Sequence, residues 1–264
     1  VITNSTFRSN SAGNDGGAIR LLESDLECSN VTFSNNSAER GGAMNLRTVT
    51  GSLNDISFID NTATISGGVA YIDASTLSVS QCQFMENGAQ FGDSFYGTSG
   101  ARLDISDSIF ANETGAEYGG CVCLTDSSVV QMQGVVFENN IAVIDGGAVY
   151  LEQSSGVITN STFRSNSAGN FGGAIRLLES DLECSNVTFS DNASVDGGAL
   201  DCLGPLILEI TDALFSNNSA ERAGAIYLVN VTGSFSDVVF RDNNASSSAG
   251  ASVFEDSRVE MSHS

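Results

Sequence analysis

Residues 163–175 read Phe-Arg-Ser-Asn-Ser-Ala-Gly-Asn-Phe-Gly-Gly-Ala-Ile, and two motifs within this stretch decide the fold. The first is a phenylalanine followed three residues later by an asparagine, and the second is Gly-Gly-Ala followed by an apolar residue. A period of 20 to 50 residues is typical of solenoids, propellers and repeat arrays. The phenylalanine recurs every 25 to 27 residues, which makes ten copies of one unit, at Phe7, Phe33, Phe58, Phe84, Phe110, Phe137, Phe163, Phe189, Phe215 and Phe240.

Both motifs recur with few exceptions. Nine of the ten phenylalanines carry Asn three residues later; after Phe110, Glu113 occupies this place and the nearest asparagine is Asn112. The glycine motif is complete in five units, beginning at Gly16, Gly41, Gly146, Gly172 and Gly197. Degraded copies occupy the other five units, at Gly67, Gly92, Gly119, Ala223 and Ala249.

A second level of repetition lies above the unit. Residues 1–27 and 157–183 differ only where Asp15 is replaced by Phe171, and the offset of 156 residues equals six units of 26. We interpret this as an internal duplication that relates residues 1–156 to residues 157–264. Because the periodicity is unbroken, we expect residues 1–264 to form one continuous repeat domain cut from a longer array.

The chain is strongly acidic. It has 32 Asp and Glu against ten arginines and no lysine, so the formal net charge is −22. A surface of this sign repels the phosphate backbone of nucleic acids and anionic lipids. We therefore exclude nucleic-acid binding. The sequence also lacks the stretch of roughly 18 apolar residues that membrane insertion of this segment would need.

Sequons for N-linked glycosylation point to an extracellular or cell-surface address. The pattern Asn-X-Ser/Thr marks surface segments of secreted proteins, although a chain rich in Asn, Ser and Thr produces some by chance. If a eukaryotic cell secretes the protein, we expect several of them to carry glycans. The candidates are Asn4, Asn30, Asn35, Asn112, Asn160, Asn186, Asn192, Asn217, Asn230 and Asn244.

Most of the six cysteines occupy positions that hold apolar residues in other units. We interpret these as buried small apolar side chains. Cys121 and Cys123 differ, because the position of Cys123 otherwise holds mainly polar or aromatic residues. This pair could bond to each other or to a partner, and the sequence leaves the connectivity open. The four cysteines at apolar positions are Cys28, Cys82, Cys184 and Cys202.

Within one unit the pattern predicts two strands and two turns. Residues 172–178 form a short strand, 179–181 a turn, 182–189 a longer strand, and 190–196 the return to the next glycine pair. Near-alternation of apolar residues before the phenylalanine is typical of a half-buried strand, and no segment shows the period of a helix. The chain is therefore all-β, with units too short for propeller blades.

A parallel β-helix satisfies these constraints best. Each unit would form one rung, and stacking would place identical residues about 4.8 Å apart. The phenylalanines then form one internal stack, and the asparagines form a hydrogen-bonded ladder along a turn. The glycine pairs fit a bend that needs positive φ or a close approach of rungs.

The paired motif resembles the repeats of a known family. Residues 163–166 and 172–175 are similar to the repeat pair of chlamydial polymorphic outer membrane proteins and their wider relatives, and the resemblance covers essentially all 264 residues. It implies a single-stranded right-handed parallel β-helix of the pectin-lyase type, with about ten rungs of about 26 residues. It also implies a large surface or secreted protein, because the chlamydial members are autotransporter adhesins.

Many β-helices cleave polysaccharides, and this chemistry requires particular residues. Glycoside hydrolysis needs converging carboxylates, and lyases of this fold add a basic residue and usually calcium. The chain has no lysine and one histidine, His263. We expect no catalytic residue, no metal site and no cofactor. Residues before the glycine pairs vary as a solvated edge does: Asp15, Arg40, Ser66, Gln90, Tyr118, Asp145, Phe171, Asp196, Arg222 and Ser248.

Four of the five tyrosines occupy one position, directly after Gly-Gly-Ala-apolar or its degraded copy. If the neighbouring apolar residues point inward, this position faces solvent, and Tyr71 would stack on Tyr96 from the adjacent rung. Exposed aromatic rows can hold sugars or partner proteins, although tyrosine also suits an exposed strand for its shape alone. The predicted outward row is Tyr71, Tyr96, Tyr150 and Tyr227.

These observations predict a non-enzymatic extracellular β-helix segment, which acts as a rigid rod with lateral contact surfaces in an adhesin, filament or matrix protein. Its expected partners are other protein subunits or cell-surface glycans and proteins, with end-to-end or lateral self-association as a further possibility. The alternative is a pectin-lyase-like protein that binds or degrades polysaccharides.

Overall fold

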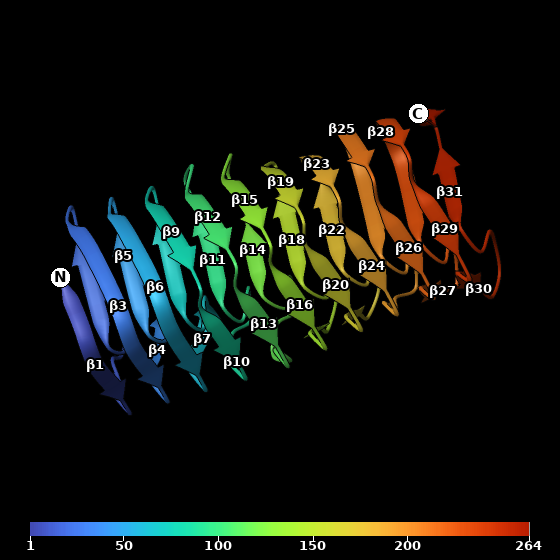
Figure 1. Cartoon of the computed structure of the whole chain (residues 1–264). Coiled ribbons are helices and arrows are strands. Elements are labelled where there is room, and N and C mark those ends of the chain that lie inside the picture. The colour runs from blue at the N-terminus through green and yellow to red at the C-terminus, as the bar shows by residue number, and fades with distance from the viewer. Residues whose placement is uncertain (264) are drawn as a thin grey trace.

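The computed structural model describes residues 1–263, which form strands, bridges and turns without a helix. The strands lie side by side in one elongated stack, with the N-terminus at one end and the C-terminus at the other (Figure 1). Each strand pairs in parallel with its counterpart in the next unit, 25 to 27 residues further on. The predicted all-β parallel solenoid is confirmed. Residues 1–263 contain no long apolar helix that could cross a membrane.

Each rung carries up to four strand segments. The first follows the glycine pair, as β2 (Ile19–Leu22), β5 (Met44–Arg47), β8 (Ala70–Asp73), β11 (Phe95–Thr98), β14 (Val122–Leu124), β18 (Val149–Glu152), β22 (Ile175–Leu178) and β31 (Ser252–Glu255). The second comprises β9 (Thr76–Ser80), β12 (Arg102–Ser106), β15 (Val129–Gln133), β19 (Ser155–Thr159), β23 (Asp181–Ser185) and β32 (Arg258–Ser262). Two longer strands join these two segments, β25 (Leu200–Thr211) and β28 (Ile226–Ser236).

The third segment contains the repeated phenylalanine, in β10 (Gln83–Met85), β13 (Ile109–Ala111), β16 (Val136–Glu138), β20 (Thr162–Arg164), β24 (Thr188–Ser190), β26 (Leu214–Ser216) and β29 (Val239–Arg241). Near the N-terminus it is continuous with the second, in β1 (Ile2–Arg8), β3 (Asp25–Ser34) and β6 (Thr50–Ile59). The fourth consists of β4 (Ser37–Arg40), β7 (Thr62–Ser66), β17 (Ile141–Ala142), β21 (Ser167–Ala168), β27 (Ser219–Ala220) and β30 (Asn244–Ala245).

The second and third segments are separate in most rungs, where a single strand over 182–189 was predicted. Asn186 lies between β23 and β24 with φ +53°, in the left-handed region. Asparagine tolerates this region better than other side chains. The chain therefore turns a corner at Asn186, and the predicted continuous strand is wrong for this rung.

The ten phenylalanines form the predicted stack inside the solenoid. Neighbouring ring centroids are 4.2 to 5.2 Å apart, and the ring planes lie within 15° of each other. The eight rings from Phe33 to Phe215 are fully buried, whereas Phe7 and Phe240 are partly buried. The stack therefore forms one continuous apolar column along the described chain.

The asparagines three residues after each phenylalanine form a buried ladder, as Asn166 shows. Its Nδ2 donates to the Phe137 carbonyl oxygen and to Asn192 Oδ1, each at 3.1 Å. Its Oδ1 accepts from the backbone N and the Nδ2 of Asn140, at 3.1 and 2.9 Å. One amide thus satisfies four buried groups, which links each rung to the rungs before and after it.

Glu113 occupies the ladder position in the fifth unit, where the asparagine is missing. Asn87 Nδ2 donates to Glu113 Oε1 at 2.9 Å, and the Glu113 backbone N donates to Asn140 Oδ1 at 3.1 Å. The side chain is fully buried. Because a carboxyl group has at most one hydrogen to donate, where an asparagine amide has two, this rung cannot repeat the complete asparagine pattern.

The glycine pair forms the predicted bend. Gly146 has φ +66°, which glycine adopts without strain. A Cβ on Gly147 would lie 2.1 Å from the Gly173 carbonyl oxygen of the next rung. The first glycine therefore allows the turn, and the second allows the close approach of the rungs.

All six cysteines are buried and free. This confirms the apolar interpretation of four of them and shows that Cys121 and Cys123 are not joined to each other. Burial raises the pKa of the Cys28 and Cys82 thiols to about 11. These thiols are therefore protonated at neutral pH and behave as packing groups.

Candidate functional site

The tyrosine position lies in the first strand segment, where Cys123 interrupts the row between Tyr96 and Tyr150. Tyr71 and Tyr96 stack across adjacent rungs, with ring centroids 5.6 Å apart and planes 14° apart. Both are partly exposed, and Tyr71 covers one face of the Tyr96 ring. The other face of Tyr96 is therefore turned toward the rung that holds Cys123.

Tyr150 and Tyr227 were predicted to face solvent, but both side chains are buried. Tyr150 is 7% exposed and Tyr227 is 6% exposed. The Tyr118 ring packs edge-on against Tyr150 at 5.3 Å, and the Arg222 guanidinium lies over the Tyr227 ring at 4.8 Å. Side chains from the position before the glycine pair thus cover these two tyrosines, so the outward row is reduced to Tyr71 and Tyr96.

A second aromatic pair comes from the position before the glycine pair. The residue directly before Gly92 is Phe91, which bridges to Tyr118 on the next rung, so Phe91 rather than Gln90 belongs to this row. The Phe91 and Tyr118 rings stack at 5.7 Å, and Phe91 meets Tyr96 edge-on at 6.2 Å. With Gln90 in this place, the sequence pattern did not indicate an aromatic row.

Together these side chains enclose a cleft of about 380 Å³, which we call the aromatic cleft. The small Cys123 side chain stands where neighbouring rungs have tyrosine, and this leaves space between the flanking rings. Polar groups line the cleft beside the rings. It is lined by Phe91, Tyr96, Tyr118, Cys123, Thr125, Tyr150 and Glu152.

The hydroxyl groups of the cleft stay protonated at neutral pH. Burial, followed by the nearby Glu152 carboxylate, raises the pKa of Tyr150, and burial is also the main cause of the raised pKa of Tyr96 and Tyr118. The Tyr150 hydroxyl donates to Glu152 Oε2 at 3.4 Å, and the Tyr96 hydroxyl lies 3.3 Å from Thr125 Oγ1. The cleft therefore combines neutral aromatic walls with one lining carboxylate.

Comparison with known proteins agrees with this architecture. The family model of the right-handed beta helix region matches residues 120–264, which is more than half of the chain. The chain belongs to this β-helix family. Residues 4–21 and 30–43 match the Chlamydia polymorphic membrane protein repeat. Curated proteins and solved structures give no significant match. The repeat matches suggest that this β-helix is a surface-associated protein.

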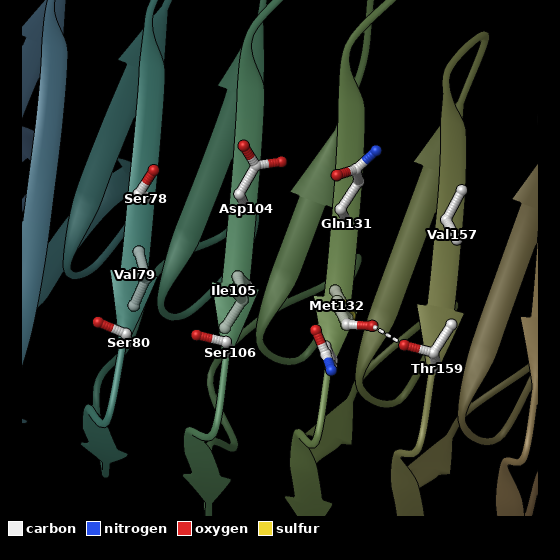
Figure 2. A pocket seen from close by; sticks show the side chains of 11 residues that line it. Ser78, Val79, Ser80, Asp104, Ile105, Ser106, Gln131, Met132, Val157 and Thr159 are labelled. Atoms are coloured by element: carbon white, nitrogen blue, oxygen red, sulfur yellow. Dashed lines mark hydrogen bonds between the residues drawn. The ribbon is translucent and has the colours of Figure 1, made fainter.

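Another hollow of the β-helix crosses four rungs on the second strand segment. Ser78, Asp104, Gln131 and Val157 project from successive strands along its length (Figure 2). Its volume is about 490 Å³, and its side chains are short or mixed in character. It offers an extended surface of mixed polar and apolar side chains, without an aromatic ring.

The interior of the β-helix holds two neighbouring acids that sequence reasoning had not singled out as a pair. Asp93 accepts from the backbone N of Ala89, Gly115 and Ala116 at 2.7, 2.7 and 3.1 Å. Burial nevertheless raises its pKa to about 7. Burial and the nearby Asp93 raise the pKa of Glu113 well above its usual value. Both side chains are fully buried, so a polysaccharide cannot reach them.

The structure also bears on metal binding and on glycosylation. Residues 1–263 contain no group of three His, Cys, Asp or Glu side chains placed to hold a metal ion. Nine of the ten candidate sequon asparagines are exposed. Asn192 is the exception and is fully buried, because it stands three residues after Phe189 and belongs to the ladder.

Asn192 is therefore expected to carry no glycan in the folded protein, whereas Asn186 of the neighbouring sequon is exposed and open to modification. Secretion from glycosylating eukaryotic cells, followed by peptide mass spectrometry, checks both sites. Asn186 serves as the matched control for access to the glycosylation machinery. A glycan on Asn192 in folded protein would contradict the ladder, since its amide bonds to Phe163 and Asn218 would be lost.

Proposed function

We propose that this β-helix is a non-enzymatic extracellular rod that presents the aromatic cleft to a partner at a cell surface or in a matrix. The continuous phenylalanine stack and asparagine ladder support the role of the rod, because they couple each rung to its neighbours. The aromatic cleft carries the proposal of contact. It is a concavity in which several partly exposed rings converge, and such surfaces mark interaction sites.

The test combines electron microscopy with capture by coated beads. We expect isolated rods without regular end-to-end or lateral contacts, and we expect beads coated with the chain to attach to cells or matrix. Tyr118→Leu removes one wall of the cleft and should reduce attachment at least about fivefold, as expected for loss of a contact aromatic. Val239→Ala, at an exposed position of the third strand segment, is the control and should have no effect.

Filaments in the micrographs, together with attachment that Tyr118→Leu leaves unchanged, would replace this proposal with self-assembly. If the beads do not attach and the rods do not assemble, both roles are wrong.

Polysaccharide binding or degradation is the second candidate. The hollow along Ser78, Asp104 and Gln131 favours it, because an extended hollow that crosses several rungs has the shape of a polymer site. A panel of polyuronates tests it through the release of unsaturated or reducing sugars. Release that Asp104→Asn abolishes would establish an enzyme and overturn the non-enzymatic proposal.

A further inference from the structure

The face that carries the aromatic cleft repeatedly pairs arginine with an aromatic ring. The Arg176 guanidinium lies 4.7 Å from the Phe171 ring centroid, and Arg222 lies 4.8 Å from that of Tyr227. Arg40 lies 5.6 Å from the Tyr71 ring centroid. All of these residues come from the position before the glycine pair or from the tyrosine position. The same two rows thus place a guanidinium on a ring in three regions of the rod.

Carboxylates accompany these arginine and aromatic pairs. Arg176 forms a buried ion pair with Asp201, and Arg222 pairs with Asp196. The Tyr227 hydroxyl also donates to Glu255 Oε1 at 2.7 Å. Each of these two sites therefore combines a ring face, a guanidinium and an acid, which is the arrangement that stabilises a cation in a partly dry environment.

The aromatic cleft has the ring faces and the acid but no cation of its own. None of its lining residues is basic, and the position between Tyr96 and Tyr150 holds the small Cys123. Glu152 lines the cleft and accepts a hydrogen bond from the Tyr150 hydroxyl, as Glu255 accepts one from the Tyr227 hydroxyl. The first acid follows its tyrosine on the same strand, whereas the second comes from the next rung. The cleft is thus chemically similar to the Arg222 site with the guanidinium taken away.

A buried acid next to the cleft adds a second observation. Asp145 stands one rung beyond Tyr118, is 8% exposed, and its Oδ1 has no hydrogen-bond partner. Its charge acts on both Tyr118 and Tyr150. The Arg176 guanidinium already acts on the Asp145 carboxylate. The buried oxygen without a donor is nevertheless costly, and a cation in the cleft would offset part of that cost. The net charge of −22 further favours a basic ligand.

We propose that the aromatic cleft binds the guanidinium group of an arginine on a basic partner protein. This assignment rests on the proposed contact function and names the chemistry of the partner. Arginine fits better than a neutral sugar because its flat group can lie on a ring while its N–H groups reach a carboxylate. A second copy of this chain is disfavoured, because two surfaces of the same strong negative charge repel each other.

The experiment is a titration of the whole chain with N-acetyl-arginine amide, followed through the NMR signals of the tyrosine rings. We expect shifts at Tyr96, Tyr118 and Tyr150, with a Kd on the order of millimolar for so small a probe. N-acetyl-citrulline amide has nearly the same shape without the charge and should bind at least about tenfold more weakly.

Two variants locate the site. Glu152→Gln should weaken binding of N-acetyl-arginine amide about three- to tenfold, whereas Glu209→Gln removes an exposed acid of the second strand segment and should leave binding unchanged. Cys123→Tyr should abolish binding, because it fills the gap with the residue that both neighbouring rungs carry. Far-UV circular dichroism confirms that each variant is folded.

The proposal is overturned if citrulline binds as well as arginine, if methyl pyranosides bind more tightly, or if no tyrosine signal shifts. Concentration-dependent shifts without ligand would identify a second copy as the occupant and overturn it as well. Bead attachment separates this proposal from the function on which it rests. If the beads attach but the chain does not bind N-acetyl-arginine amide, only the guanidinium site is wrong. If the chain binds N-acetyl-arginine amide but the beads do not attach, only the contact function is wrong.

Discussion

Phe163→Ala is expected to lower the free energy of unfolding by about 3–5 kcal/mol. The Phe163 ring is fully buried in the middle of the stack, between Phe137 at 4.7 Å and Phe189 at 5.0 Å. Alanine would leave a cavity and remove both stacked contacts, each worth about 0.5–1.5 kcal/mol beyond burial. Urea denaturation followed by far-UV circular dichroism measures the loss.

Phe7→Ala is the matched control. Phe7 has the same place in its unit, but it is partly exposed, and within residues 1–263 it stacks on one ring, Phe33. We expect it to lose less than half as much stability as Phe163→Ala. Equal losses in the two variants would show that the stack does not stabilise the rod as a column. Because rungs interact with nearest neighbours, Phe163→Ala should also split unfolding into two steps.

Glu113→Gln is expected to stabilise the protein at pH 8 and to reduce the dependence of stability on pH. The folded protein holds the Glu113 proton to a higher pH than the unfolded chain, because burial and Asp93 raise the pKa of this carboxyl. Linkage then requires stability to be full below the unfolded pKa and to fall as pH rises toward the folded pKa. The free energy of unfolding then changes with pH by up to about 1.4 kcal/mol per pH unit for one proton.

Glutamine keeps a carbonyl oxygen for Asn87 and adds an amide donor, as the asparagines of other rungs have. The stabilisation at pH 8 should be on the order of 1.4 kcal/mol for each unit that separates the two pKa values. Asp93 remains and should leave a residual slope up to its pKa of about 7. Denaturant titrations between about pH 4.5 and about pH 8, in steps of about half a pH unit, provide the measurement. This range covers the window that linkage defines.

Glu209→Gln is the control for Glu113→Gln, because Glu209 is exposed and its substitution removes one acid without touching the ladder. If Glu113→Gln lowers stability at pH 8, or if the slope stays as steep as in the parent chain, Glu113 is not a destabilising charge in the ladder. In that case its carboxylate must be stabilised by groups other than Asn87.

Local pattern was sufficient for most of the rung but not for its details. Stacking of Phe163 and bonding of Asn166 follow from repetition, because parallel pairing in register brings equivalent residues together. The corner at Asn186 was not predicted, since an apolar pattern interrupted by one asparagine does not reveal its positive φ. The burial of Asn192 had a usable signal, because its place three residues after Phe189 marks it as part of the ladder.

The aromatic cleft depended on contacts that no single unit contains. Tyr150 is buried by Tyr118, which comes from the preceding rung, and Tyr227 is covered by Arg222. A period analysis assigns both tyrosines to one outward position and cannot say which neighbour covers them. The gap above Cys123 likewise exists only because the tyrosines on both sides are in register with it.

Repetition in the sequence was enough to specify a parallel β-helix, with its phenylalanine column, asparagine ladder and glycine bends. The physical reason is that one pattern repeated ten times can bury its apolar face only by stacking. The tertiary structure alone decided which variable side chains are exposed, where the cleft lies and which acids are buried. These properties depend on pairs of side chains about 26 residues apart that meet on adjacent rungs.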